Sequence, residues 1–417
     1  MRNLERKKIG SICLLFGKTM LLFLLNSACQ QKTQEVNISE NKHQTTNVSK
    51  NIGKDCVTNY HPDTDYFPDQ IDSDYATGFT VEYRNHYKVV TVKNPWKDAD
   101  VQFQYVLVQC GTPIPKDYKK AQIITVPVQT VVTMSTTHLP HLQKLGILEK
   151  LVGVSSFKNI NTSEVRKKIE RRELKEVGNN ASVNVEQLLE LNPDLIMTYG
   201  SGNPEFDSHP KLLEAGLPVV INAEYLESSP LGRTEWIKFT ATFFNREAKA
   251  EEVFSAIATE YERIASLARK VENKPTVFTG FSFKGTWYVA GGKSYFAQYL
   301  ADAGANYLWS DNNSKASLPV DFESVFQRAA EAEFWLNGSQ SWSSLNDILM
   351  SDDRYKNFAA LQTGQVFNNN AILNETGGND YWESGIANPH IVLSDLITIF
   401  HPQLLPDREL VYYRQLN

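Results

Sequence analysis

The sequence predicts an α/β protein with two lobes, each a parallel-type sheet with flanking helices, joined by one long helix and preceded by a small β element. Three observations support this fold class. Short apolar strands alternate with short amphipathic helices from residue 121 onward. One uninterrupted helical pattern, residues 246–274, divides this alternation. A similar segment is also written twice, at 183–200 and 320–338. Alternating strands and helices are typical of parallel sheets covered by helices.

The N-terminus has the pattern of an export signal. Residues 1–8 are basic, and the apolar run that follows is broken only by Lys18. Its strongest apolar part, residues 20–25, is too short to span a bilayer, so we expect residues 1–28 to be a signal peptide. "LLNSACQQ" resembles a bacterial lipobox, which would make Cys29 the lipid attachment site. Asn26 departs from that pattern, and an ordinary signal with an incidental cysteine is the alternative.

Residues 29–55 are predicted to form a flexible tether behind the lipid anchor. They are polar and asparagine-rich, and cannot bury enough apolar surface to offset the entropy of ordering. Beyond the tether the chain has two cysteines, Cys56 and Cys110. In an exported protein such a pair is often a disulfide, although two buried free thiols are the alternative. No cysteine or histidine spacing indicates structural zinc.

The first lobe is expected at residues 56–245, with the β element at 56–120. "FTVEYRNHYKVVTVKNPW" alternates apolar and polar residues around turn signals, and "VQFQYVLVQCG" is another strand. "QIITVPVQTVVTM" then begins the alternating part. "LPHLQKLGILEKLVGV" and "HPKLLEAGLPVVIN" each give a short helix followed by a strand.

The connecting helix is expected at residues 246–272 and the second lobe at 273–417. Val253, Ile257, Tyr261, Ile264 and Ala268 recur at steps of three to four residues and so share one helix face. The second lobe restarts with the strand "PTVFTGFSF" and closes with a helix near "PHIVLSDLITIF".

The repeated segment places one glutamate in each lobe. "VNVEQLLELNPDLIMTYG" and "VDFESVFQRAAEAEFWLNG" put Glu186 and Glu323 three residues after a valine. Each copy predicts a short helix followed by an apolar strand. Asn184 and Asp321 stand where N-caps of these helices belong.

Six segments in order resemble one protein family: "LGILEKLVGVSS", "VNVEQLLELNPDLIMTYG", "NREAKAEEVF", "GTWYVAGGKSYFAQYLADAGANYLW", "FAALQTGQVFNNNA" and "VLSDLITIFHPQLLP". The chain resembles the periplasmic or lipoprotein substrate-binding proteins of ATP-binding cassette (ABC) importers for iron-siderophores, haem and cobalamin, the class III type with a helical backbone. The resemblance covers residues 126–405. The β element and the tether lie outside its typical pattern.

The resemblance implies a monomeric solute receptor in the cell envelope, lipid-anchored and facing the periplasm or exterior. It would carry a ferric siderophore or similar metal chelate to a permease dimer with its ATPase subunits, and would hold no cofactor of its own. Cobalamin or haem is the alternative cargo. In this family a glutamate in each lobe docks onto the permease, which implies that role for Glu186 and Glu323. The simpler alternative is stabilisation of two helix N-termini by acidic side chains.

The cargo is expected in the loops at the carboxyl ends of the strands. Aromatic walls with few polar groups suit a large, partly apolar ligand, and Arg233 could pair with its anionic groups. Several of these aromatics could instead be core packing. The candidate ligand-binding residues are Thr137, His138, Tyr199, Tyr225, Arg233, Phe283, Trp287, Trp342, Tyr381 and Trp382.

Other functional classes find less support. His138 and His141 share a helix face and suggest a zinc or manganese receptor, or an axial ligand to haem or a corrinoid, but no further histidine ligand is evident in the loops of the second lobe. We find no nucleophile elbow, dinucleotide fingerprint or HExxH motif, so we expect no enzyme. A net charge of −6 without a basic stripe argues against a nucleic-acid partner. A purely structural surface lipoprotein is the remaining alternative.

Overall fold

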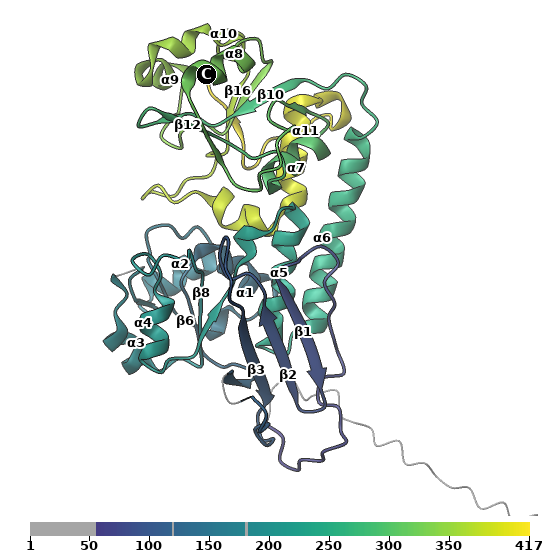
Figure 1. The fold of residues 1–417 in the computed structure, drawn as a ribbon, viewed down its shortest axis with the longest axis vertical. Helices are drawn as coiled ribbons and strands as arrows, with labels where there is room; N and C mark the ends of the chain where they lie inside the picture. The colour runs from purple at the N-terminus through teal and green to yellow at the C-terminus, as the bar shows by residue number, and fades with distance from the viewer. Residues whose placement is uncertain (1–55, 119–120, 180–181) are drawn as a thin grey trace, which may run out of the picture. The chain divides into compact units, whose positions relative to one another are not determined.

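The computed structural model describes residues 56–118, 121–179 and 182–417. The predicted signal peptide, Cys29 and the tether lie outside these residues. The described chain forms two lobes, with β1–β9 in the first and β10–β17 in the second (Figure 1). The predicted fold class, α/β with two lobes, is confirmed.

The β element is a sheet of four strands in the order β1-β2-β3-β4, antiparallel except for the parallel pair β3 and β4. Its strands are β1 (Phe79–Arg84), β2 (Tyr87–Val92), β3 (Phe103–Gln109) and β4 (Gln122–Val126). The sequence placed residues 122–126 in the lobe that follows. The structure instead pairs them in parallel with β3, and the strand ends before Pro127, which has no N–H to continue the ladder.

The main sheet of the first lobe is parallel throughout, in the order β7-β6-β5-β8-β9. Its strands are β5 (Val131–Thr133), β6 (Leu151–Val154), β7 (Lys175–Glu176), β8 (Leu195–Thr198) and β9 (Val219–Ile221). The helices of this lobe are α1 (Leu139–Lys144), α2 (Ser163–Glu170), α3 (Val185–Leu191), α4 (His209–Glu214) and α5 (Pro230–Thr242), with short 3-10 turns at Thr136–His138, Leu148–Lys150 and Glu224–Leu226.

The long helix α6 (Glu247–Ala268) follows α5 and leads into the second lobe (Figure 1). Its buried face includes Phe254, Ile257, Tyr261 and Ile264, and it packs against α5 and α11. The helix ends earlier than the sequence pattern indicated. It ends at Ala268, with Arg269 as the C-cap, whose N–H donates to the carbonyl oxygen of Ala265. Pro275 disfavours helical geometry only at residue 274, directly before it.

The second lobe has a five-stranded sheet in the order β13-β10-β15-β16-β17, parallel except for the last strand. A small antiparallel sheet, β11-β12-β14, lies beside it. The strands are β10 (Thr276–Thr279), β11 (Ser282–Phe283), β12 (Thr286–Val289), β13 (Asn306–Tyr307), β14 (Leu318–Val320), β15 (Phe334–Leu336), β16 (Val366–Asn368) and β17 (Arg414–Gln415).

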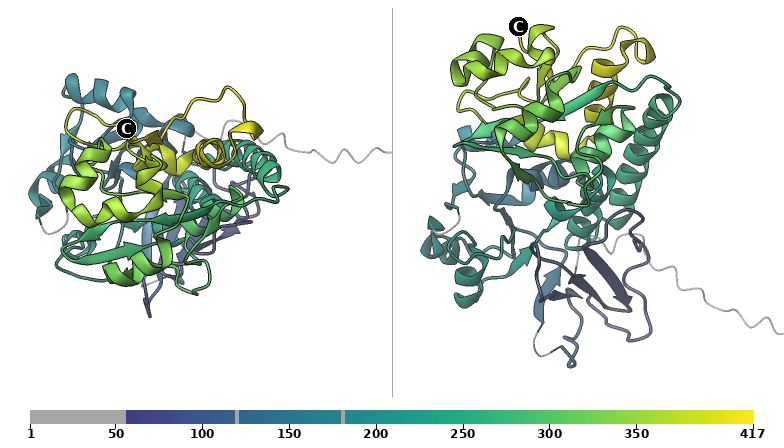
Figure 2. Two further views of the ribbon diagram at one scale, coloured as in Figure 1. Left: turned by 90° about the horizontal axis from the view of Figure 1, so that it is seen from above. Right: turned by 45° about the horizontal axis from the view of Figure 1, so that its top comes forward.

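The helices of the second lobe are α7 (Tyr295–Asp302), α8 (Phe322–Ala329), α9 (Leu345–Ser351), α10 (Ala359–Gln362) and α11 (Pro389–Phe400), with 3-10 turns at Asp353–Asn357, Asp380–Trp382, Ser384–Ala387 and Pro402–Leu404. Figure 2 shows α11 running beside α6 in two further views.

The repeated segment occupies equivalent places in the two lobes. α3 leads into β8, which lies between β5 and β9, and α8 leads into β15, which lies between β10 and β16. The predicted N-caps are confirmed. The side chain of Asn184 accepts a hydrogen bond from the N–H of Gln187 at 3.0 Å, and that of Asp321 accepts one from the N–H of Ser324 at 2.8 Å.

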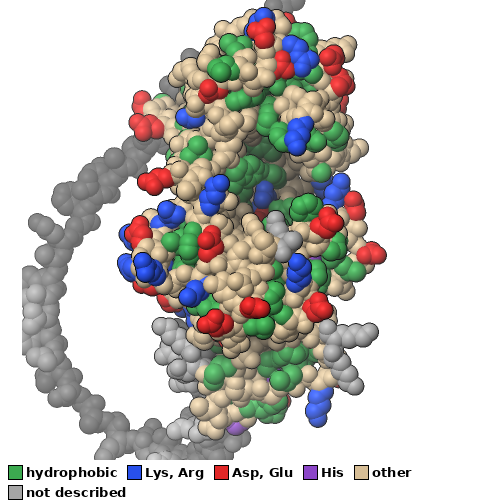
Figure 3. Space-filling view, turned by 90° about the vertical axis from the view of Figure 1, so that its left-hand side faces the viewer, with side chains coloured by type: hydrophobic (Ala, Val, Ile, Leu, Met, Phe, Trp, Pro, Cys, Tyr) green, Lys and Arg blue, Asp and Glu red, His purple; other side chains and the backbone are tan. Residues whose placement is uncertain are grey.

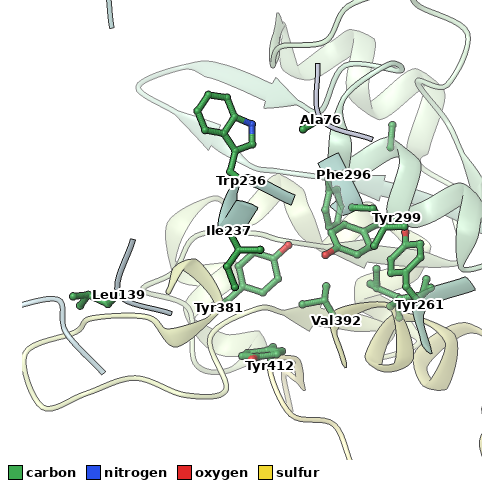
Figure 4. Packing of buried hydrophobic residues seen from close by; sticks show 14 of the residues in the cluster. Ala76, Leu139, Trp236, Ile237, Tyr261, Phe296, Tyr299, Tyr381, Val392 and Tyr412 are labelled. Carbon is green, nitrogen blue, oxygen red and sulfur yellow. The ribbon is translucent and has the colours of Figure 1, made fainter. Parts of the chain in front are cut away.

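One hydrophobic core extends through both lobes. It includes Ile237 of α5, Tyr261 of α6, Tyr299 of α7 and Val392 of α11 (Figure 4). Since these helices come from both lobes and from the connection between them, the joint between the lobes is part of the hydrophobic core. Domain interfaces of this apolar kind oppose relative movement.

Polar contacts add a second link between the lobes. The carboxylate of Glu383, fully buried in the second lobe, accepts hydrogen bonds from the N–H groups of Asn161 and Thr162 at 2.7 and 2.8 Å. The ammonium group of Lys144 donates to the side-chain oxygen of Asn388 at 2.8 Å. A large opening of the lobes would have to break these contacts, so we expect little lobe movement.

A disulfide ties the start of the described chain to the β element. Cys56 and Cys110 are bonded, with their Cα atoms 4.8 Å apart. The N–H of Val57 also donates to the carbonyl oxygen of Cys110 at 2.9 Å. None of the described helices is long and apolar enough to cross a membrane.

Candidate binding cleft

A cavity of about 900 Å³ lies between the lobes. It is bounded by residues that follow the carboxyl ends of β9, β10, β15 and β16, the position where ligands bind in open α/β sheets. Figure 3 shows the surface hollowed here, with hydrophobic side chains in its depth. Its aromatic lining consists of Trp96, Tyr225, Tyr288, Tyr295, Phe296 and Trp382.

A second cavity of about 460 Å³, here called the polar cavity because most of its lining residues are of polar types, adjoins the first. It follows the carboxyl ends of β5, β6 and β8, and its wall is rich in hydroxyl groups from Ser135, Thr136, Thr137, Ser155, Ser156, Tyr199 and Ser201. Tyr225 and Arg233 line both cavities. The two spaces therefore meet at these side chains and form one cleft, with the six aromatic side chains in the larger part and most of the hydroxyl groups in the smaller part.

Arg233 stands at this junction in the first turn of α5. Ser229 caps that helix by accepting from the N–H of Gly232 at 3.0 Å, and Pro230 opens it. The guanidinium is almost completely buried. It donates to Oε2 of Glu224 at 3.1 and 2.9 Å and stacks over the ring of Tyr295, whose centroid is 4.4 Å away. Arg233 thus links the first lobe to α7 of the second.

The pairing with Glu224 changes what Arg233 can offer a ligand. Burial opposes ionisation of Glu224, but the attraction and hydrogen bonds of Arg233 outweigh it and hold the pKa of Glu224 below its ordinary value. The carboxylate therefore stays charged and offsets the guanidinium. The sequence expectation was an arginine free to pair with an anionic ligand. In the structure a ligand meets a buried, neutralised ion pair instead.

The two histidines of "HLPH" are buried. Desolvation lowers the pKa of His138 to about 4 and that of His141 to about 3, so both are neutral at pH 7. Nδ1 of His141 lies 3.0 Å from the hydroxyl of Thr240, and His138 borders the polar cavity. Within the described part of the chain, no group of three or more His, Cys, Asp or Glu side chains could hold a metal ion.

Four of the remaining predicted ligand residues line the cavities, and Phe283 does not. Thr137 and Tyr199 line the polar cavity, Tyr225 lines both cavities and Trp382 lines the larger one. The hydroxyl of Tyr225 donates to the carbonyl oxygen of Gly200 at 2.5 Å, which fixes the ring at the junction. Phe283 is exposed on β11 but belongs to neither lining.

Trp287, Trp342 and Tyr381 are buried behind the cleft rather than exposed in it. The indole N–H of Trp287 donates to the carbonyl oxygen of Thr279 at 2.9 Å, inside the aromatic core of the second lobe. Trp342 supports the loop after β15 so closely that a Cβ on Gly338 would lie 2.4 Å from its ring. Tyr381 packs edge-on against Trp382. These residues shape the walls without forming their surface.

Several lining residues were not anticipated from the sequence. Tyr295 and Phe296 open α7 directly after the N-cap Ser294, and Lys315 precedes β14. Asn94, Trp96 and Lys97 come from the β2–β3 loop, whose "KNP" was interpreted only as a turn signal. Trp96, next to this turn, was the one sequence signal that the loop could line a binding site. The local sequence does not show which part of the protein the loop faces.

Glu186 and Glu323 lie in the first turns of α3 and α8, and both are exposed. Oε1 of Glu323 is 3.6 Å from a guanidinium nitrogen of Arg354, and both side chains are more than half exposed. Such a pair contributes little to stability.

Residues 131–372 match the family described as "Periplasmic binding protein", and this chain belongs to that family. It is 26% identical to "Uncharacterized lipoprotein MJ0878" of Methanocaldococcus jannaschii, over 98% of this chain and 96% of that protein. It is also 24% identical to the "Vitamin B12-binding protein" of Vibrio campbellii, over 53% of this chain and 75% of that protein.

Solved structures share the fold. A possible iron-binding (periplasmic solute-binding) protein from Staphylococcus epidermidis superposes with a TM-score of 0.52 at 20% identity, covering 66% of this chain and 98% of that one. A periplasmic heme binding protein from Pseudomonas aeruginosa gives 0.51 at 19% identity, with 70% and 98% covered. The chain is thus a member of the periplasmic binding protein family with the fold of solved periplasmic solute-binding proteins, as its resemblance implied.

Proposed function

We propose that this protein binds a ferric siderophore or a similar metal chelate between its lobes and delivers it to an ABC permease. The observation that carries the proposal is the cavity of about 900 Å³ at the strand ends of both lobes, whose wall combines six aromatic side chains with polar and charged ones. A pocket of this size, with aromatic surface and several polar groups, suits a bulky, partly apolar ligand that also carries polar groups. A bare zinc or manganese ion would need a cluster of donor side chains instead.

Cobalamin is the second candidate cargo, with haem beside it. The similarity to the Vitamin B12-binding protein of Vibrio campbellii favours cobalamin. The paired charges of Arg233 and Glu224 leave the junction close to neutral, which also suits a corrinoid with amide groups at its edge. The polar cavity, which adjoins the larger one, would receive these amide groups.

To deliver its cargo to the permease, the protein would be exported and anchored to the membrane. Lipid attachment at Cys29 would keep the receptor at the membrane, and similarity to an archaeal lipoprotein over nearly the whole chain supports this. Glu186 and Glu323 would meet basic groups of the permease, one per lobe. Two exposed carboxylates held by a stiff body can set orientation and on-rate. The family is one of substrate-binding proteins, and we propose no catalytic role.

Tryptophan fluorescence tests the cargo. Trp96 and Trp382 line the cavity, so a coloured chelate bound there should quench emission. The full chain, purified in detergent, would be titrated with a ferric hydroxamate, a ferric catecholate, haem and cyanocobalamin. At least one probe should bind with a Kd below about 10 μM, which is roughly −7 kcal/mol.

The control for this titration is free tryptophan amide, which corrects for light absorbed by the coloured probes. Binding of cyanocobalamin alone would select the second candidate. Failure of all four probes to bind would reject the chelate-receptor proposal.

A further inference from the structure

The β element lies outside the family match, which begins at residue 131, yet it forms one wall of the cavity. Thr77 and Gly78, just before β1, and Asn94, Trp96 and Lys97 in the β2–β3 loop all belong to the lining. The β element, which lies outside the matched family region, therefore contributes to the wall of the candidate binding site.

Two buried carboxylates attach the start of this wall to the first lobe. Glu235 accepts hydrogen bonds from the N–H groups of Asp74, Tyr75 and Ala76 at 3.0, 2.7 and 2.7 Å. Glu227 accepts from those of Thr77 and Gly78, each at 2.8 Å. Five successive backbone donors, residues 74–78, are thus held by side chains from the α5 region. This clamp fixes the segment at the cavity edge.

Trp96 holds the β2–β3 loop in place by packing of its ring. Its ring packs so closely on the loop after β8 that a Cβ on Gly200 or Gly202 would lie 2.8 or 2.6 Å from it. It also stacks on His209, with ring centroids 5.5 Å apart. The rigid mount of Trp96 leaves its neighbours Asn94 and Lys97 exposed towards the cavity.

The charges at the cavity indicate what this wall meets. Arg233 is neutralised by Glu224, and the carboxylate of Glu227 is occupied by the backbone clamp. The exposed charged side chains of the lining are Lys97 and Asp98 on the β element and Lys315 on the second lobe. Lys97 and Asp98 are 4.0 Å apart and both strongly exposed, so solvent screens the pair and Asp98 offsets Lys97 much less than Glu224 offsets Arg233. Cations on both sides of a cleft favour a ligand with acidic groups at its edge.

We infer that the β element is part of the cargo site and selects the cargo, with Asn94 limiting its size and Lys97 contacting its acidic groups. This inference rests on the proposed function, since it concerns the same cleft. It assigns specificity to a segment that comes before the family fold in the chain.

The test compares two pairs of matched variants of the full chain by isothermal titration calorimetry. Asn94→Trp and Lys97→Glu alter the wall. Asn85→Trp and Lys93→Glu make the same changes at exposed positions of the β element outside the cavity lining. The ligand is whichever of the ferric hydroxamate, ferric catecholate, haem or cyanocobalamin the unmodified chain binds most tightly. Each wall variant should weaken binding tenfold or more, while its control stays within twofold.

A loss in either wall variant that its control does not share supports the inference. Unaltered affinity in both wall variants, or equal losses in variants and controls, would overturn it. Thermal unfolding of all four variants verifies that they are folded. Because the unmodified chain is titrated first, failure of the proposed function shows there as absence of binding, separate from failure of the inference.

Discussion

At the scale of single residues, the cleft depends on buried polar groups whose charge state the fold decides. Arg233 and Glu224 are charged and paired, whereas His138 is neutral because burial lowers its pKa to about 4. The sequence identified Arg233, Tyr199, Tyr225 and Trp382 as lining candidates, and they border the cavities. It could not separate them from Trp287 and Trp342, because an aromatic residue at a strand end can point into the cleft or into the core.

The burial of His138 predicts a pH-dependent stability. Its pKa is about 4 when folded and about 6.5 when unfolded, so below pH 6.5 the unfolded chain binds a proton that the folded chain does not. The stability present above pH 6.5 is therefore progressively lost as the pH falls towards 4. Between pH 7 and 4.5 this histidine should cost the folded state about 2.5 kcal/mol.

The check is urea unfolding of the unmodified chain and of His138→Gln at both pH values. The glutamine variant lacks the titrating group, so its deficit in unfolding free energy relative to the unmodified chain should shrink by about that amount at pH 4.5. His61→Gln, at an exposed position, controls for removing an imidazole. A deficit that is the same at both pH values would contradict the prediction.

At the scale of elements, the repeated segment and its caps follow directly from local chemistry. Short polar side chains at Asn184 and Asp321 accept from the first-turn N–H groups, and apolar strands follow. The β element is a different case. Its strands were predictable from alternation, but its place against α5 and α6 depends on contacts between residues more than 140 positions apart, such as those of Asp74 with Glu235 and Gly78 with Glu227.

One such contact is the buried ion pair of Lys88 on β2 with Glu247 at the start of α6. Nζ of Lys88 lies 2.5 Å from Oε1 of Glu247 and 2.6 Å from the carbonyl oxygen of Thr242. Burial lowers the pKa of Lys88 and raises that of Glu247, and the attraction between them opposes both shifts. The pair ties the β element to the connecting helix.

Removing one partner of this pair should be costly. Lys88→Met leaves Glu247 buried without its counter-charge, and we expect the free energy of unfolding to fall by about 3–5 kcal/mol. Adding Glu247→Leu should restore part of that loss, because no unpaired charge then remains. Urea unfolding measures both, with Lys93→Met at an exposed position of the same element as control. A double variant less stable than Lys88→Met would contradict this account.

At the scale of the whole molecule, the two lobes behave as one body with two faces. The shared core around α5, α6, α7 and α11 and the contacts of Glu383 hold the lobes together. In the proposed function the cleft would take the cargo, and the exposed first turns of α3 and α8 would be left for a partner. A stiff body would allow two distant carboxylates to meet a symmetric permease in register.

The docking proposal predicts a separation of uptake from binding. Glu186→Arg combined with Glu323→Arg should abolish uptake of the cargo by cells that carry the cognate permease. Ligand affinity measured by calorimetry should stay within twofold, since neither residue lines a cavity. Glu190→Arg with Glu331→Arg makes the same charge change at exposed positions nearby. Normal uptake by the first double variant would reject the docking role.

The sequence by itself determined the lobe pattern, the long helix, the capped repeats and the chemical types available for a cleft, because these depend on neighbours a few residues apart. Only the tertiary structure decided which of those residues meet. In the structure Glu224 offsets the charge of Arg233, Trp287 and Trp342 lie in the core, and the β2–β3 loop lies at the cavity. These outcomes depend on burial and on contacts between residues far apart in the sequence, which local sequence patterns do not reveal.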